Sequence, residues 1–82
     1  MIPEKEIARG PILVVDDSEG IRSYLSTLLR GWGYQVELVA SGEAALEFIE
    51  ENGSPGLVLL DLMLPGMGGL ETLERIRKVD EM

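Results

Sequence analysis

Three aspartates follow short apolar runs, at positions where carboxylates can do chemistry. Asp16 and Asp17 come directly after four branched apolar residues, and Asp61 comes directly after a second run of the same kind. Carboxylate oxygens are the ligands that hard cations such as Mg²⁺ prefer, and a carboxylate can also attack phosphorus as a nucleophile. Three converging carboxylates repel one another strongly unless a cation lies among them. A hard-metal site is therefore the first chemical hypothesis.

Each of these acids, taken alone, also has an ordinary structural explanation. An acid between a strand and a helix often serves the helix N-terminus, and an acid after a buried strand can form a turn. The combination is more specific, because two acids follow one predicted inner strand and one acid follows another. The carboxyl ends of parallel strands meet at one edge of the sheet, where ligands bind in open α/β folds.

The elements that must position these acids alternate along the chain. The two apolar runs, residues 12–15 and 57–60, are typical of strands buried on both faces in a parallel sheet covered by helices. Residues 34–38 alternate apolar and polar side chains, which predicts an edge strand with one wetter face. Helical patterns with short connections separate and follow the strands. The sequence therefore predicts an α/β fold built from a βαβ series.

The helix ends and inward faces can also be predicted. Ser18 and Ser41 are expected to cap the first two helices, Gly31 is expected just past the end of the first, and residues 53–55 end the second. The side chains expected to face the core recur at helical spacing: Ile21, Tyr24, Leu25, Leu28 and Leu29, then Ala45, Phe48 and Ile49, and finally Leu70, Leu73 and Ile76.

Other conspicuous side chains have structural interpretations. Arg22 and Arg30 are expected to be solvated helix charges. The remaining four are interpreted as packing residues, two at a helix–strand corner and two in the core or in a loop: Trp32 and Tyr34, then Met63 and Met67.

Composition narrows the function classes. The chain has 82 residues, a formal net charge of −8, and neither cysteine nor histidine, so disulfides, thiolate or imidazole metal sites and Ser/His/Asp chemistry are excluded. The acidity argues against direct nucleic-acid binding. Residues 1–10 are interpreted as a charged N-terminal leader and not as a signal peptide, and no run is long enough to span a membrane. A cytoplasmic protein without membrane contact is expected.

Three segments together resemble a known family. They are ILVVDD at 12–17, SGEAAL at 41–46 and DLMLPGMGGLE at 61–71. In this order and spacing they resemble the receiver domain of two-component response regulators, over nearly the whole chain, with residues 11–82 forming a partial domain. The resemblance implies a three-layer, flavodoxin-like parallel sheet, of which this chain supplies three strand–helix units, the (βα)3 portion of the usual (βα)5.

The resemblance also implies roles for individual residues. Asp61 would accept a phosphoryl group from a sensor histidine kinase or a phosphotransfer protein, with Mg²⁺ as cofactor. The metal would be held by Asp16, Asp17, Asp61 and the backbone carbonyl of Met63. Such a domain is a phosphoacceptor and not an enzyme. One residue departs from the family pattern: Gly68 stands where Asp or Asn is usual, which we expect to cost a few tenths of a kcal/mol of helix-cap energy.

The resemblance further implies a truncation after the third unit. The family's fourth strand carries a Ser or Thr that responds to the phosphoryl group, and its fifth strand carries a Lys that pairs with that group. This chain has no counterpart of either residue. We expect the third strand to be an open edge and the chain to form a homodimer, through that strand or through the first helix. The alternative function is a non-switching interaction module or folding fragment. A weaker alternative, an aspartate-based phosphatase or phosphotransferase, lacks the usual Asp-x-Asp.

Overall fold

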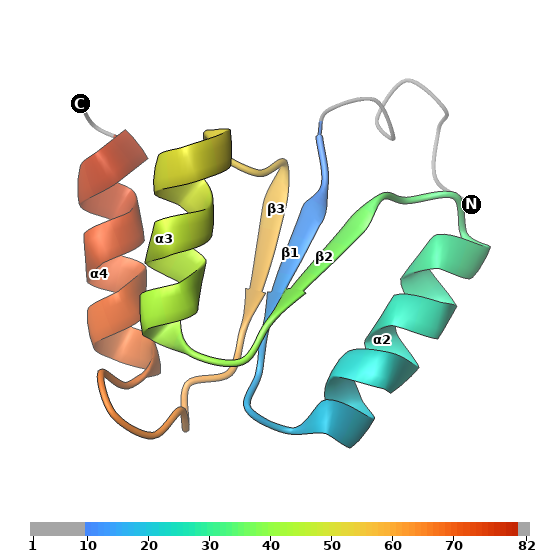
Figure 1. Ribbon diagram of the computed structural model, residues 1–82, viewed down its shortest axis with the longest axis horizontal. Coiled ribbons are helices and arrows are strands. Elements are labelled where there is room, and N and C mark those ends of the chain that lie inside the picture. The colour runs from blue at the N-terminus through green and yellow to red at the C-terminus, as the bar shows by residue number, and fades with distance from the viewer. Residues whose placement is uncertain (1–9, 81–82) are drawn as a thin grey trace.

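The computed structural model of the chain describes residues 10–80, so the expected leader lies outside the described residues except for Gly10. Three parallel strands form one sheet in the order β2-β1-β3. One helix covers one face of this sheet and two helices lie side by side on the other (Figure 1). The α/β prediction with three strand–helix units is confirmed. The elements are β1 (Ile12–Val15), α2 (Glu19–Gly31), β2 (Val36–Val39), α3 (Gly42–Asn52), β3 (Leu57–Leu60) and α4 (Gly69–Asp80).

The central strand, β1, is buried along its whole length. It pairs with both neighbours, and its last residue, Val15, lies opposite Val39 on one side and Leu60 on the other. The three strands therefore end level with one another, at the edge drawn at the bottom of Figure 1. The ladder continues one residue further, because the amide of Asp61 donates to the Val15 carbonyl at 2.9 Å.

Alternate residues of β1 supply two separate cores, as the period of two in a strand requires. Leu13 and Val15 pack on the α3–α4 side, and Ile12 and Val14 pack on the α2 side. The buried partners are Ala45, Ile49, Leu64 and Ile76 in the first cluster, and Leu29 and Val36 in the second.

The helix starts agree with the sequence. The Ser18 hydroxyl accepts a hydrogen bond from the amide of Ile21 at 3.3 Å, and the Ser41 hydroxyl accepts one from Ala44 at 3.0 Å. Both predicted caps are confirmed. Each serine satisfies an amide that the helix itself leaves without a partner.

The end of α2 corrects the prediction for Gly31. Gly31 is the last helical residue, Trp32 forms the C-cap, and it is Gly33 that takes the left-handed conformation, with φ of 95°. The indole of Trp32 is 57% exposed and does not pack at the helix–strand corner, whereas Tyr34 does pack against the α2-side core.

The inward faces of two helices were predicted only in part. Leu29 of α2 is buried, but Ile21 and Tyr24 are 48% and 66% exposed. The contacts of α2 are mainly with β2 and β1, which leaves one side of the helix uncovered. On α4, Ile76 is buried while Leu70 and Leu73 are exposed. The inner face of α4 is instead formed by small residues at its start together with Ile76, since α4 packs closely against α3.

Candidate functional site

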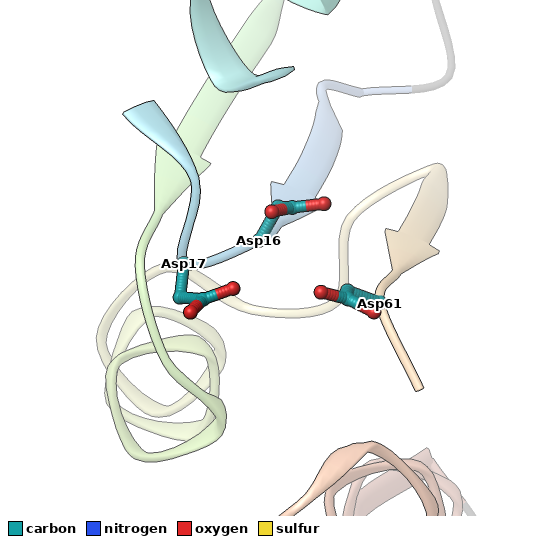
Figure 2. Close-up of side chains that lie close together, drawn as sticks. All are labelled: Asp16, Asp17 and Asp61. Atoms are coloured by element: carbon teal, nitrogen blue, oxygen red, sulfur yellow. The ribbon is translucent and has the colours of Figure 1, made fainter. Parts of the chain in front are cut away.

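The three aspartates lie together at the carboxyl edge of the sheet. Asp16 and Asp17 occupy the turn from β1 to α2, and Asp61 is the first residue after β3 (Figure 2). One carboxylate oxygen from each side chain lies within 4.8 Å of the others. Asp16 and Asp61 are partly buried and Asp17 is exposed. The convergence predicted from the strand ends is thus present.

Backbone amides hold two of the carboxylates in place. One oxygen of Asp16 accepts a hydrogen bond from the amide of Ser18 at 2.9 Å, and one oxygen of Asp61 accepts from the amide of Met63 at 2.8 Å. Both are local turns in which an aspartate bonds the backbone two residues on. Each bond uses a single oxygen, so the second oxygen of each carboxylate stays available for a cation or for attack on a substrate.

Arg22 has a role that the sequence interpretation missed. Its guanidinium donates to the backbone carbonyl of Asp16 at 2.7 Å, across the turn that carries the acidic pair. Arg30 likewise donates to the Val36 carbonyl at 2.8 Å, at the other end of α2. The prediction that both arginines are solvated helix charges therefore missed these two hydrogen bonds; Arg22 is partly buried, whereas Arg30 is exposed as expected. The available signal was the position of Arg22 in the first turn of the helix that starts beside the acids.

The loop after Asp61 is anchored by a residue that the sequence interpretation overlooked. The Met63 side chain is 86% exposed, so the interpretation of Met63 as a packing residue is wrong, while Leu64 is 6% exposed and belongs to the α3–α4 core. Met67 is partly buried, in agreement with loop packing. Leu64 therefore fixes the loop, and the backbone of Met63 is left near the acids. Its carbonyl as a metal ligand stays a prediction.

Gly68, the residue expected to weaken the cap of the last helix, has a backbone conformation typical of glycine. Its φ is 82°, in the left-handed region that favours glycine over a residue with a side chain. The next residue, Gly69, opens α4. In this loop the backbone conformation, and not a capping side chain, is what residue 68 contributes.

A cavity of about 320 Å³ adjoins the acids on the α2 side of the sheet. Asp16 and Asp61 form its polar rim and apolar side chains form its walls, so it joins the acidic cluster to an apolar hollow between α2 and β3. The apolar lining residues are Val14, Val15, Leu25, Leu59 and Leu60.

Within residues 10–80, none of the helices combines the length and the apolar character needed to cross a membrane. Among the same residues, one cluster of acidic side chains could hold a metal ion, and it consists of the three aspartates.

Comparison with known proteins agrees with the motifs. Residues 12–82 match the family described as the response regulator receiver domain. Sporulation initiation phosphotransferase F of Bacillus subtilis is 44% identical over 70 residues, which are 85% of this chain and 56% of that protein. The DNA-binding response regulator MtrA of Mycolicibacterium smegmatis is 44% identical over 69 residues, 84% of this chain and 30% of that protein. The chain thus spans about half of the first relative's length and under a third of the second's.

Solved structures show the same fold. The N-terminal domain of a response regulator receiver protein from Methanoculleus marisnigri JR1 is 47% identical with a TM-score of 0.78, covering 83% of this chain and 55% of that one. The chemotaxis protein CheY4 of Vibrio cholerae is 32% identical with a TM-score of 0.83, covering 90% and 61%. The three aspartates cluster at the carboxyl ends of the parallel strands, and the family model, the relatives and the solved structures all match. The chain therefore belongs to the response regulator receiver domain family.

Proposed function

We propose that this chain accepts a phosphoryl group on Asp61 in a two-component phosphorelay, from a sensor histidine kinase or a phosphotransfer protein in the cytoplasm. The observation that carries the proposal is the convergence of three carboxylates within 4.8 Å at the carboxyl edge of the sheet. Family membership supports it, because the same residues match the receiver motif. The domain is proposed as the acceptor in the transfer and not as an enzyme acting on a separate substrate.

The donor set fits Mg²⁺. The ion takes oxygen ligands in octahedral geometry, usually one or two carboxylates together with waters and phosphate oxygens. Asp16, Asp17 and Asp61 would hold it, together with the carbonyl of Met63. When bound, the ion would neutralise negative charge on the transferring phosphoryl group. The partly exposed position of the cluster leaves room for the phosphoryl donor.

The proposed transfer step uses the Asp61 carboxylate oxygen that the Met63 amide does not bond. One carboxylate oxygen is fixed by the amide of Met63 at 2.8 Å, so the second oxygen attacks phosphorus. The new bond joins this oxygen to phosphorus, and the phosphorus–nitrogen bond of the donor phosphohistidine breaks. The imidazole leaves with its electron pair and takes up a proton, and Asp61 becomes an acyl phosphate.

Intact-mass analysis after incubation with a small-molecule phosphodonor and Mg²⁺ tests this proposal. The wild-type chain should gain one phosphoryl group, Asp61→Asn should gain none, and Glu50→Gln, an exposed acid on α3, should behave like the wild type. Omission of Mg²⁺ should suppress the gain. No gain in the wild type would contradict the proposal and favour the non-switching interaction module.

We also propose that two copies of the chain associate through the free edge of β3 or through α2. Leu57 of β3 is 52% exposed and Tyr24 of α2 is 66% exposed, and β3 pairs with β1 on one side only within the described residues. An unpaired edge offers its amides and carbonyls to a second strand. Sedimentation analysis at several concentrations should show a dimer; a cooperatively folded monomer at micromolar concentration would contradict this.

A further inference from the structure

Thr72 is a polar side chain in a place where apolar ones are the rule. It is 0% exposed, and among residues 10–79, whose side-chain burial is described, it is the one polar side chain found fully buried. Its hydroxyl donates to the carbonyl of Gly68 at 2.7 Å, and its backbone amide bonds the same carbonyl at 3.1 Å. Two donors from one residue thus hold the carbonyl that precedes α4.

The start of α3 makes room for this side chain. A Cβ atom built on Gly42 would overlap Oγ1 of Thr72 and would lie 3.1 Å from its Cβ and 3.3 Å from its Cγ2. Gly42 therefore lets α3 and α4 approach until the backbone of one helix touches a side chain of the other. A side chain at position 42 would therefore displace the Thr72 hydroxyl from the place where it bonds Gly68.

On the other side, the start of α4 lies directly against the residue that carries the proposed acceptor. A Cβ atom on Gly69 would overlap the Cα of Leu62 and would lie 2.5 Å from the carbonyl oxygen of Asp61. The backbones of residue 69 and of residues 61–62 therefore approach too closely for a side chain to lie between them. A continuous path of contacts leads from Gly42 through Thr72 and residues 68–69 to Asp61.

We infer that Thr72 is a positioning residue: its hydroxyl holds the Gly68 carbonyl and thereby sets where the Asp61 carboxylate stands relative to Asp16 and Asp17. Burial of a hydroxyl is costly unless it is hydrogen-bonded, so the bond to Gly68 is retained in the folded state. The consequence for metal binding and phosphoryl transfer rests on the proposed function, whereas the consequence for the loop does not.

The loop is tested first, in the metal-free protein. Thr72→Val keeps the shape of the side chain and removes the donor, while Thr72→Ser keeps the donor. NMR measures the hydrogen-exchange rate and the chemical shift of the Met63 amide. Because this amide donates to the Asp61 carboxylate, both quantities report the position of that carboxylate. We expect Thr72→Val to speed this exchange about three- to tenfold relative to amides of β1, as loss of one hydrogen bond allows, and Thr72→Ser to restore it. Equal behaviour of Val and Ser would overturn the inference.

A double-mutant cycle at Gly42 and Thr72 tests the same inference without relying on the folding of Thr72→Val alone. Gly42→Ala should displace the Thr72 hydroxyl and shift the Met63 amide in the same direction as Thr72→Val. In a Thr72→Ala background Gly42→Ala should have a much smaller effect, because the overlapping oxygen is absent. Additive effects on the Met63 amide would contradict the path through Thr72.

Mg²⁺ titration calorimetry then tests the functional consequence. Thr72→Val should weaken Mg²⁺ binding several-fold and Thr72→Ser should bind like the wild type; unchanged affinity in Thr72→Val would overturn the positioning role at the metal site. If the wild type binds no Mg²⁺, the proposed function fails, and the Met63 amide alone decides whether Thr72 positions Asp61.

Discussion

At the scale of single residues, two opposing effects act on the site: the three carboxylates repel one another, and backbone amides hold two of them in place by hydrogen bonds. Asp16, Asp17 and Asp61 place like charges within 4.8 Å, which costs folding energy in the metal-free chain. Local hydrogen bonds from the amides of Ser18 and Met63 keep two of the carboxylates turned into the cluster. The proposed divalent cation would relieve this repulsion, and its binding would then stabilise the folded chain.

Asp17→Asn separates the repulsion between the carboxylates from the stabilisation that bound Mg²⁺ would give. In the metal-free protein we expect the variant to be more stable than the wild type by about 0.5 kcal/mol, since one exposed like charge is removed. With Mg²⁺ the order should reverse. Mg²⁺ at about 100 times its dissociation constant stabilises the wild type by about 2.7 kcal/mol, and the variant should lose most of this gain. Urea unfolding with EDTA and with Mg²⁺ measures both; a variant that keeps the full gain would remove Asp17 from the metal site.

Arg22→Met tests the hydrogen bond across the acidic turn. Loss of a charged donor to the partly buried carbonyl of Asp16 should lower the free energy of unfolding by about 1–2 kcal/mol. Arg77→Met, on the exposed face of α4, is the matched control and should stay within about 0.5 kcal/mol of the wild type. Urea denaturation of the two variants checks this. Equal small effects would restore the interpretation of Arg22 as a solvated charge.

At the scale of elements, glycines decide where the helices end and how closely they approach. Of the two glycines that flank Trp32, Gly31 is helical with nothing within 4 Å of a built Cβ atom, whereas Gly33 has φ of 95°. The first position tolerates a side chain and the second does not.

Alanine at these two positions should therefore have opposite effects. Gly31→Ala should stabilise the chain by about 0.5 kcal/mol, because alanine favours the helix and loses less entropy on folding. Gly33→Ala should destabilise it by about 1 kcal/mol, because the left-handed conformation strains an L-residue. Thermal unfolding followed by circular dichroism gives both signs. A destabilising Gly31→Ala together with a neutral Gly33→Ala would indicate that Gly31, and not Gly33, has the left-handed conformation after the helix.

The serine caps allow a second comparison between elements. Ser41→Ala should cost about 1 kcal/mol, because its hydroxyl accepts a partly buried bond of 3.0 Å from Ala44. Ser18→Ala should cost about half as much, since its bond to Ile21 is longer, at 3.3 Å, and exposed. Chemical denaturation measures both free energies, and a larger cost at Ser18 would contradict the order expected from the hydrogen bonds.

At the scale of the whole molecule, the two faces of the sheet are covered unequally. Two helices cover one face and α2 alone covers the other (Figure 1). The cavity beside Asp16 and Asp61 is lined on the α2 side by Leu25. Both α2 and β3, which line this cavity, carry exposed apolar residues: Ile21 and Tyr24 on α2, and Leu57 on β3. Association of two copies would bury part of this surface.

Leu57→Lys tests that association. Lysine on an edge strand opposes strand pairing, so the variant should shift the monomer–dimer equilibrium towards monomer, with a dissociation constant at least about tenfold higher. Leu70→Lys, at a 63% exposed position on α4, is the matched control and should leave the equilibrium unchanged. Sedimentation velocity over a concentration series distinguishes them. A stronger effect of Leu70→Lys would place the contact on α4, and equal effects would exclude the β3 edge.

Much of the fold could be predicted because it depends on neighbours in the sequence. The apolar runs at 12–15 and 57–60 mark strands by composition, the serines mark helix starts by local hydrogen bonding, and an acid directly after each strand must lie at the carboxyl edge. These features need no knowledge of distant contacts. The convergence of Asp16, Asp17 and Asp61 follows from them once the strands are parallel.

The remaining features were decided by packing between segments far apart in the chain. Periodicity placed Leu70 and Leu73 inward, but close approach of α4 to α3 through Gly42 turned Thr72 to the inside instead. Arg22 looked like a surface charge until the turn after β1 placed the Asp16 carbonyl within its reach. The sequence alone thus determined which residues stand at the site, and the tertiary structure decided which residues hold them there, because such contacts depend on how whole helices pack.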